Sequence, residues 1–565
     1  MSRPHKLFFP ALIALLLASC GGGDKTNTAD IRVTCLGSAC AAGGVESYAN
    51  GAAQVWTYQN TGDTPVTLDL NFSNLARGQE LAYVFGNGYS ADINSLPSPG
   101  QPSEADGSAG KTTVGTSSQA ELAVRNLSLE SQDEWRHRQH EREADLLRLL
   151  QPVLSGAGAQ GAASAASTTS GAPVGASLIT SAVGAQRAWT DGFSGDDKVY
   201  AGTALSSCQV GNGRKVVIWA DETATKGVAN SSTLAAIEAT LCGDKGAVQR
   251  MARLLGNVWG PTSRSNLIQD TSAGLLDINV VLLSVGKDKP WSGYFYGGDT
   301  FLKSSVPDSN EALAFYINAD LIAANFDYTL SVLVHELTHM VYWYERSAAR
   351  GAPRTDTWLS EMIAMMSEDI ITPTVVSDAD GRPYRPITSY RLPAYINSGG
   401  GLNMVAWAKI DKANPYYSMA GAFGAYLNRQ YGLAIYKRLV TDCLSISNGW
   451  ACLDAVVKNA GGKGVDEEFN RFGLTVFGLG DTNGPSSRFS FPTRVDGEYV
   501  LAGLDLSGLS KYRPWKSPEV LSWATGTHSY FVERADVSIF TFTRGGITVP
   551  PRSRLNIMIR QGTGT

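Results

Sequence analysis

A single pentapeptide at 335–339, HELTH, limits what this chain can fold into more than any other stretch. It lies in an apolar segment without Gly or Pro, and Asp327 precedes it as a candidate N-cap, so the sequence predicts a buried helix. Side chains four residues apart share one face of a helix, so His335 and His339 can bind one metal ion. Glu336 lies about 100° further round the helix, where it can reach a metal-bound water without being a ligand.

This spacing is the HExxH pattern of zinc peptidases, in which the glutamate acts as general base. A chance match by two core histidines is the alternative, and it is infrequent inside an apolar helix. A catalytic zinc ion needs three protein ligands and one open position. The third ligand is expected to be a carboxylate, because the other four histidines lie far away in sequence, at His5, His137, His140 and His528.

Glu345 is the first carboxylate to consider as that ligand. It stands ten residues after His335, where metzincins place their last ligand. Those proteins turn the chain at a Gly after the second histidine, and Tyr342 occupies that position here. If the helix continues, Glu345 lies about 15 Å along the axis from His335. We therefore expect Glu345 to be solvated.

The segment 356–369 offers a better candidate. It predicts a second helix with an apolar face, on which Glu361 lies among Trp358, Leu359 and Met365. An unpaired buried carboxylate is costly, and a zinc ion would supply its partner. Glu361 is thus the predicted third ligand. Two turns further on, Glu368 is the second choice, or an outer group that orients a ligand histidine.

The first residues predict export. Residues 1–19 have a basic start and a short apolar run, as in a signal peptide, and LASC at 17–20 resembles the lipobox of bacterial lipoproteins. We expect a lipidated Cys20, a tether over 20–47, and attachment to the outer membrane or cell surface of a Gram-negative bacterium. An ordinary signal peptide that ends near a Cys is the alternative.

The cysteine count agrees with export. Six cysteines remain besides Cys20, and their proximity in sequence suggests the pairs 35–40, 208–242 and 443–452. Disulfides of this kind are typical of an oxidising compartment. The formal net charge of −5 gives no reason to expect nucleic acid as a partner.

A chain of 565 residues predicts several domains. Alternating apolar residues and turn signals over 48–125 predict a β-sandwich-like domain. Segment 126–172 combines a charged amphipathic helix with a Ser/Gly/Ala-rich linker, and whether the residues before 173 form a removable pro-segment stays open. After the central domain, 481–565 predicts a C-terminal β-domain, with His528 expected at its surface.

The central part, 173–480, has an α+β order. Buried strands are predicted at 215–219 and 278–283, and a helix over 234–255 with a break at Gly243 or Gly246. Two aromatic runs precede the HELTH helix, at 293–299 and 314–318. One of them can be an edge strand that receives an extended peptide, and a core strand is the alternative.

Three stretches, HELTHM, WLSEMIAMMSED and YYSMAGAFGAYL, together resemble the hyicolysin-type family of gluzincin metallopeptidases, over roughly 173–480. The resemblance implies a zincin (gluzincin-like) fold and one Zn²⁺ bound by His335, His339 and Glu361, with Glu336 as general base. Tyr417 is the candidate donor to the oxyanion and Tyr416 the next, although either can be a plain core aromatic.

Together these features predict a zinc metallopeptidase, an endopeptidase by expectation, that hydrolyses peptide bonds of extracytoplasmic proteins through a Glu-activated zinc-bound water. Its expected partners are a protein or peptide substrate and a membrane, reached through Cys20. A surface-binding lipoprotein with a non-catalytic zincin fold is the main alternative. A zinc hydrolase of a non-peptide bond is a third interpretation.

Overall fold

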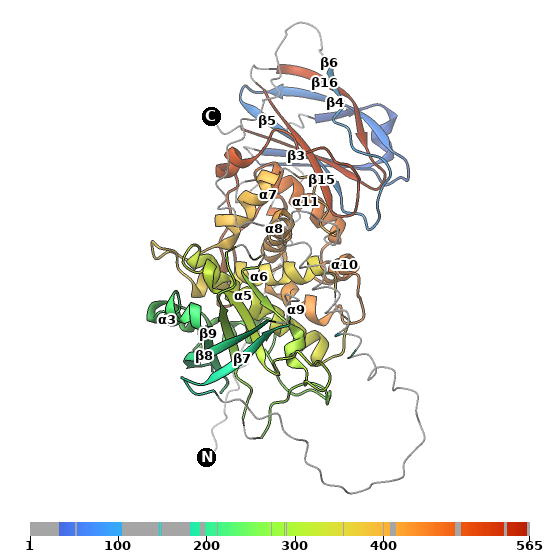
Figure 1. Cartoon of the computed structure of the whole chain (residues 1–565). Coiled ribbons are helices and arrows are strands. Elements are labelled where there is room, and N and C mark those ends of the chain that lie inside the picture. The colour runs from blue at the N-terminus through green and yellow to red at the C-terminus, as the bar shows by residue number, and fades with distance from the viewer. Residues whose placement is uncertain are drawn as a thin grey trace, which may run out of the picture.

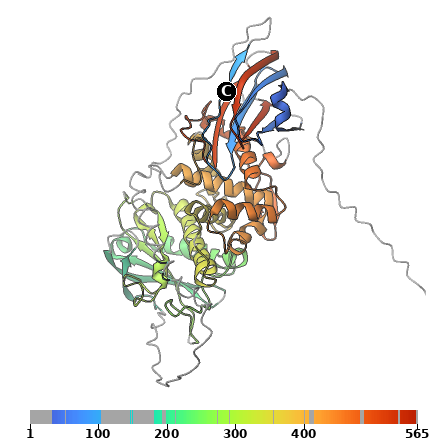
Figure 2. The same cartoon turned by 90° about the vertical axis from the view of Figure 1, so that its right-hand side faces the viewer.

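The computed structural model divides into a β-sandwich and an α+β body, with a layer of helices between the sandwich and the body's sheet (Figures 1 and 2). The structure describes residues 33–50, 53–103, 181–192, 198–211, 213–272, 274–287, 291–353, 355–398, 400–406, 414–480, 487–535 and 539–561, and the single positions 146, 149 and 289. Cys20, the signal segment and nearly all of 126–172 lie outside these residues.

The sandwich consists of a four-stranded sheet, in the order β1-β4-β16-β6, and a five-stranded sheet, in the order β15-β5-β17-β3-β2. Its N-terminal strands are β1 (Val33–Leu36), β2 (Gly44–Asn50), β3 (Ala53–Gln59), β4 (Val66–Leu75), β5 (Gln79–Asn87) and β6 (Gln101–Ser103). The C-terminal strands are β15 (Thr527–Arg534), β16 (Ile539–Val549) and β17 (Arg554–Gln561).

The two separate β-domains expected from the sequence are therefore one sandwich. Strand β16 lies between β4 and β6, and β17 lies between β3 and β5. Apolar side chains from both ends of the chain meet in one core, where Leu70 and Tyr83 pack with Ile547 and Ile557. The expected tether also ends early, because strands begin at Val33. Alternation along a strand shows which face is buried but does not show which strand it pairs with.

The body contains a six-stranded sheet in the order β11-β12-β10-β9-β8-β7, in which β9, β10 and β12 are parallel. The strands are β7 (Gln186–Asp191), β8 (Lys198–Gln209), β9 (Lys215–Asp221), β10 (Ile278–Leu283), β11 (Gly293–Phe295) and β12 (Leu313–Asn318). Strands β9 and β10 confirm the predicted buried strands. The predicted break near Gly243 is also present, between helices α3 (Ser231–Leu241) and α4 (Ala247–Leu254). A short helix, α2 (Glu222–Lys226), follows β9.

Two long helices carry the candidate site residues. Helix α5 (Phe326–Tyr342) continues without a turn into the π-helix η5 (Trp343–Ala348), and α6 (Thr357–Val375) follows it. Helix α5 packs against both α6 and the edge strand β11. Almost all of α5 after its first turn is buried, which explains why apolar side chains occur on every side of this helix.

Further helices connect the body to the sandwich. They are α7 (Leu392–Ser398), α8 (Asn414–Tyr431), α9 (Leu433–Thr441), α10 (Gly449–Asn459) and α11 (Val465–Phe477), and a small hairpin of β13 (Arg494–Asp496) and β14 (Tyr499–Leu501) follows. Helix α11 packs on the sandwich strands β5 and β17. At this contact the predicted surface position of His528 is wrong, because its side chain is fully buried.

His528 lies between the sandwich and the helices. Its ring stacks on Phe469 of α11 with centroids 3.9 Å apart, its Nε2 lies 2.9 Å from the Phe469 carbonyl, and Nδ1 lies 3.3 Å from the hydroxyl of Tyr395. Gly473 leaves the space that the ring occupies, because a Cβ there would lie 2.3 Å from Nε2. Strand β15 thus has both faces covered, and its histidine is a core residue.

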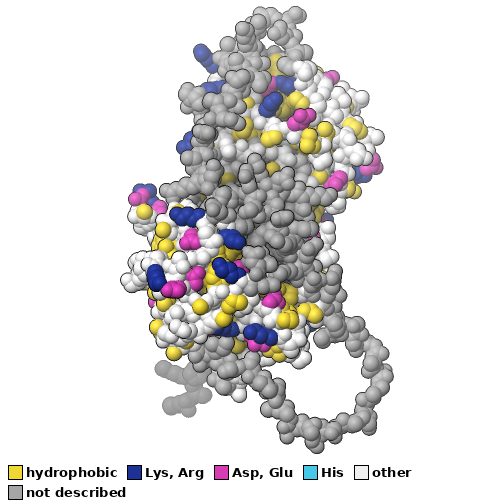
Figure 3. Space-filling view, viewed as in Figure 1, with side chains coloured by type: hydrophobic (Ala, Val, Ile, Leu, Met, Phe, Trp, Pro, Cys, Tyr) yellow, Lys and Arg dark blue, Asp and Glu magenta, His cyan; other side chains and the backbone are white. Residues whose placement is uncertain are grey.

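All three predicted disulfides are present, at Cys35–Cys40, Cys208–Cys242 and Cys443–Cys452. The helices in the described part of the chain are each too short or too polar to span a bilayer. On the face seen in Figure 3, basic and acidic side chains are interspersed over the described surface.

Candidate metal centre

Helix α5 presents its two histidines to one point. The rings of His335 and His339 lie one helical turn apart, with centroids 4.8 Å apart and their Nε2 atoms separated by 3.1 Å. Two imidazoles gain little from so close an approach unless they share a proton or a cation. The spacing of four residues on a buried helix therefore produces the pair of donors expected from the sequence.

Helix α6 adds the carboxylate. Oε2 of Glu361 lies 3.0 Å from Nε2 of His335 and 3.5 Å from Nε2 of His339. Among the described residues this is the one group of three ionisable side chains whose donor atoms lie close enough for a metal ion, all within 4.8 Å of one another. The sequence-predicted ligand set is thus brought together by two helices that are adjacent in the chain.

The three donor atoms fit a zinc ion. In a tetrahedral site with bonds of about 2.0–2.1 Å, neighbouring donors lie roughly 3.3–3.4 Å apart, and the three distances here are 3.0, 3.1 and 3.5 Å. The side chains of His335, His339 and Glu361 keep 10%, 17% and 13% of their surface exposed. The three donor side chains are therefore largely buried but keep some contact with solvent.

A second carboxylate, that of Glu368, contacts the other ring nitrogen of His335. Nδ1 of His335 lies 2.6 Å from Oε1 of Glu368, two turns after Glu361 on α6. Nη2 of Arg391 donates to both oxygens of Glu368, at 3.1 and 3.2 Å. Because Nδ1–H donates to this carboxylate, the lone pair of Nε2 is left for a metal. Two roles were expected for Glu368, a metal ligand or a group that orients a ligand histidine. The geometry matches the orienting role.

His339 has a weaker partner. The hydroxyl of Ser360 lies 3.4 Å from its Nδ1, a long hydrogen bond to a neutral group. Thr338 of α5 and Ser367 of α6 also hydrogen-bond to each other. Side-chain hydrogen bonds therefore join the two metal-facing helices at more than one point.

Comparison with known families identifies the chain. The sequence model of the peptidase M30 family matches residues 196–560, more than half of the 565 residues. The protein belongs to the peptidase M30 family. This confirms, at the level of the family, the resemblance to hyicolysin-type metallopeptidases. No curated protein matches the chain.

The M30 match is wider than the resemblance read from the sequence, which ended near 480. It continues through β15, β16 and β17, which belong to the sandwich. The family match thus includes the three C-terminal strands of the sandwich. Since those strands pair with β3, β4 and β5, the N-terminal strands complete a unit that the M30 match covers only in part.

Charge in the M30 site favours a cation. Burial would raise the pKa of Glu361, but the charge of His339 and the hydrogen bond from His335 hold that pKa well below its usual value. Burial also opposes protonation of His335, whose hydrogen bonds to Glu361 and Glu368 nevertheless raise its pKa to about 10. The two carboxylates thus stabilise positive charge at the histidine rings, and a bound divalent ion would supply that charge in place of the protons.

Glu336 lies beside the ligand cluster on α5 and is 5% exposed. Burial raises its pKa, and the two neighbouring histidines act in the opposite direction. A general base works best when its pKa is near the working pH, so a carboxylate with a raised pKa suits proton transfer better than an ordinary exposed glutamate.

Tyr417, the predicted oxyanion donor, lies in the first turn of α8 and is half-buried against the main core. Helix α8 packs against α6, with Gly421 against Met365 and Gly424 against both Met362 and Met366. Tyr417 is one turn before Gly421, at the start of this helix.

Glu345 lies outside the donor group. Its Oε1 accepts a hydrogen bond from the backbone N–H of Asn257 at 2.8 Å, and Oε2 pairs with Arg350 at 2.5 Å. The side chain is only 12% exposed, so the expectation that it is solvated is wrong. The reason is the π-helical turn at Trp343–Ala348, which carries Glu345 onto the loop after α4 instead of into solvent.

Sequence reasoning missed Arg391 and Ser360. Arg391 follows Glu368 by 23 residues and reaches it from the end of a π-helical turn, η6 (Ile387–Arg391). No local pattern marks an arginine as the partner of a given buried carboxylate. Ser360 precedes Glu361 on α6, and a serine in a helix usually bonds to its own backbone, so its contact with His339 gave no signal.

Proposed function

We propose that this protein is a zinc-dependent endopeptidase with a gluzincin-type site formed by His335, His339 and Glu361. The observation that carries the proposal is the triangle of Nε2, Nε2 and Oε2 atoms, with sides of 3.0, 3.1 and 3.5 Å. Two imidazoles and one carboxylate are a common ligand set of catalytic zinc, and they leave a fourth position open.

When bound, zinc supplies Lewis acidity: it lowers the pKa of a water and polarises the scissile carbonyl. The carboxylate of Glu336 takes the proton of the attacking water and then delivers it to the nitrogen of the leaving amine. Glu368 holds the Nδ1–H of His335, so that the imidazole keeps its orientation through the cycle. Arg391 in turn holds both oxygens of Glu368.

Tyr417 is the proposed donor to the oxyanion. It lies in the first turn of α8, and that helix packs against α6, which carries Glu361. A phenol there can donate a hydrogen bond to the oxygen that becomes negative during the attack, and such donors are worth about 10²–10³ in rate. Tyr416, the neighbouring residue, is the second candidate.

Strand β11 is the proposed binding edge for substrate. It is the outermost strand of the described sheet, and its inner side pairs with β12 in antiparallel register. Of the two aromatic runs noted in the sequence, Gly293–Phe295 is thus at the edge and Leu313–Asn318 is a core strand. A peptide that pairs with β11 lies beside α5, because Gly293 packs against Val332.

The site is proposed to work outside the cytoplasm, on protein or peptide substrates, with the chain anchored through a lipidated Cys20. The three disulfides support an oxidising compartment. Labelling with a radioactive fatty acid tests the anchor, because Cys20→Ser should abolish the label.

Zinc content and casein digestion test the enzymatic proposal. We expect about one zinc ion per chain, and hydrolysis that stops when a chelator removes the ion and returns when zinc is restored. Bound zinc without hydrolysis of any of a panel of proteins would instead favour the surface-binding alternative.

A further inference from the structure

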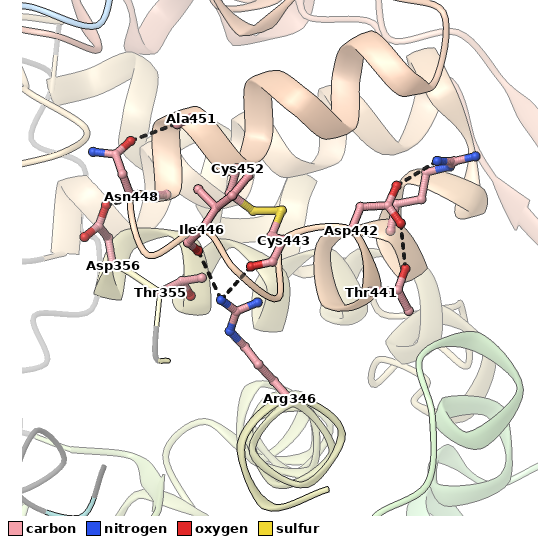
Figure 4. Close-up of a disulfide and its surroundings, with 12 residues drawn as sticks. Arg346, Thr355, Asp356, Thr441, Asp442, Cys443, Ile446, Asn448, Ala451 and Cys452 are labelled. Carbon is pink, nitrogen blue, oxygen red and sulfur yellow. Dashed lines mark hydrogen bonds and ion pairs between the residues drawn. A yellow bond between two sulfur atoms is a disulfide. The ribbon is translucent and has the colours of Figure 1, made fainter. Parts of the chain in front are cut away.

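A loop closed by a disulfide lies against the ends of both metal-facing helices. Cys443 and Cys452 are bonded and fully buried, and they enclose the segment between α9 and α10. We call residues 443–452 the clamp loop. Figure 4 shows it between Arg346, which reaches it from a helix seen end-on, and Asp356.

Arg346 connects the clamp loop to α5. It lies in η5, the direct continuation of α5, and its side chain is fully buried. One guanidinium nitrogen, Nη2, donates to the carbonyls of Cys443 at 2.8 Å and Ile446 at 3.1 Å, while Nε donates to the carbonyl of Pro353 at 2.7 Å. A buried charge held by backbone carbonyls is sensitive to their positions, because each lost contact leaves part of the charge unsolvated.

Asp356 connects the clamp loop to α6. It precedes the first residue of that helix, and its Oδ2 accepts a hydrogen bond of 2.7 Å from the backbone N–H of Gly449 in the clamp loop. The approach is close: a Cβ on Gly449 would lie 3.0 Å from the ring of Trp358. Trp358 and Trp450 then pack with ring centroids 5.8 Å apart.

These contacts lie a short distance from the donor atoms. Arg346 follows His339 by seven residues, and Asp356 precedes Glu361 by five. At 1.5 Å per residue, the two contacts are only about 10 Å and about 8 Å along the chain's helical rise from a metal-facing side chain. A third link, the 2.9 Å hydrogen bond between Tyr342 and Thr355, joins the end of α5 to the start of α6 directly.

We propose that the clamp loop is a positioning element of the metal site, with Arg346 and Asp356 as its positioning residues. It fixes the end of α5 against the start of α6, and so sets the distance between the histidine pair and Glu361. The disulfide limits the conformations of the loop. It thereby keeps the carbonyls of Cys443 and Ile446 in position to accept from Arg346, and the N–H of Gly449 in position to donate to Asp356. The proposal rests on the metal site described above.

Zinc affinity, measured by competition with a chromogenic chelator, tests the proposal. The variants are Cys443→Ser/Cys452→Ser, Asp356→Ala, Arg346→Met and the conservative Arg346→Lys. Cys35→Ser/Cys40→Ser is the matched control, since it opens a similarly short disulfide loop in the sandwich. Thermal melting of the zinc-free proteins shows which variants fold, and the visible spectrum of the Co²⁺ forms reports the geometry of the donors.

We expect the clamp variants to bind zinc about tenfold more weakly and to show a changed Co²⁺ spectrum, with Arg346→Lys intermediate and the control like the wild type. If the double cysteine variant does not fold, the zinc affinity and Co²⁺ spectrum of Asp356→Ala test the proposal in its place. Wild-type zinc affinity and an unchanged Co²⁺ spectrum in folded clamp variants would overturn the proposal. A wild-type protein that binds no zinc would overturn the metal site and this role together.

Discussion

Nδ1 of His335 lies 2.6 Å from Oε1 of Glu368, while Nε2 of the same ring faces the other two donors of the site. One carboxylate therefore fixes the tautomer and the orientation of the histidine that lies closest to Glu361. We predict that Glu368→Gln weakens zinc binding by roughly 10–100-fold, as loss of an outer partner typically does. Glu345→Gln is the control, since that carboxylate lies outside the donor group, and isothermal titration of both variants measures the difference. Equal affinities would argue against the orienting role.

Glu336 is predicted to move protons without holding the metal. Glu336→Gln should keep its zinc, because the donors come from three other side chains, but should lower kcat by about 10²–10⁴. Metal content by atomic absorption and hydrolysis of a fluorogenic peptide are measured on the same preparation. Zinc-loaded Glu336→Gln with wild-type turnover would contradict the assignment, and loss of zinc would show that Glu336 has a structural role instead.

His528 predicts a pH dependence of stability. Burial lowers its pKa to about 3, only slightly opposed by the hydrogen bond to Phe469. The unfolded chain takes up a proton near pH 6.5, so this contribution to stability is complete above that pH and is lost as the pH falls toward 3. Between pH 7 and pH 5 the loss is about 2 kcal/mol.

Urea unfolding at the two pH values measures this loss, with His528→Gln as the non-titrating comparison. The variant should be less stable at pH 7 but should lose about 2 kcal/mol less than the wild type on going to pH 5. The same pH dependence in both proteins would show that His528 does not titrate differently on folding.

The single sandwich predicts the effect of N-terminal truncation. Removing residues 1–103 takes away β1 to β6, leaving β16 and β17 without the neighbours that pair with them. The truncated chain should be insoluble or rapidly digested by trypsin. Removing only residues 1–32 keeps every described strand pair and is the control. A stable, soluble chain beginning at residue 104 would contradict the shared sandwich. It would instead favour the hypothesis that the N-terminal residues form a removable pro-segment.

Local patterns predicted much of the site. The HELTH helix, the helix with Glu361, two buried strands and the break near Gly243 all depend on the spacing of apolar residues within one segment, which sequence shows directly. Disulfide pairs were also predictable, since each joins a cysteine to the next cysteine along the chain.

Contacts between distant segments were not predictable. Arg391 meets Glu368 only because η6 folds back on α6. His528 is buried because α11 covers the outer face of β15, a face that an isolated strand would expose to solvent. The pairing of the N-terminal and C-terminal β-segments in one sandwich is also a contact between distant segments. The sequence of a strand shows which face is buried but not which strand it pairs with.

The proposed function requires that His335, His339 and Glu361 bind one catalytic zinc ion. Anomalous scattering at the zinc edge, from a crystal of the zinc-loaded protein, locates that ion. We expect one strong peak about 2.0–2.2 Å from Nε2 of His335, Nε2 of His339 and a carboxylate oxygen of Glu361. A zinc peak coordinated by Glu345 or Glu368 in place of Glu361, or no peak between the two histidines, would contradict it.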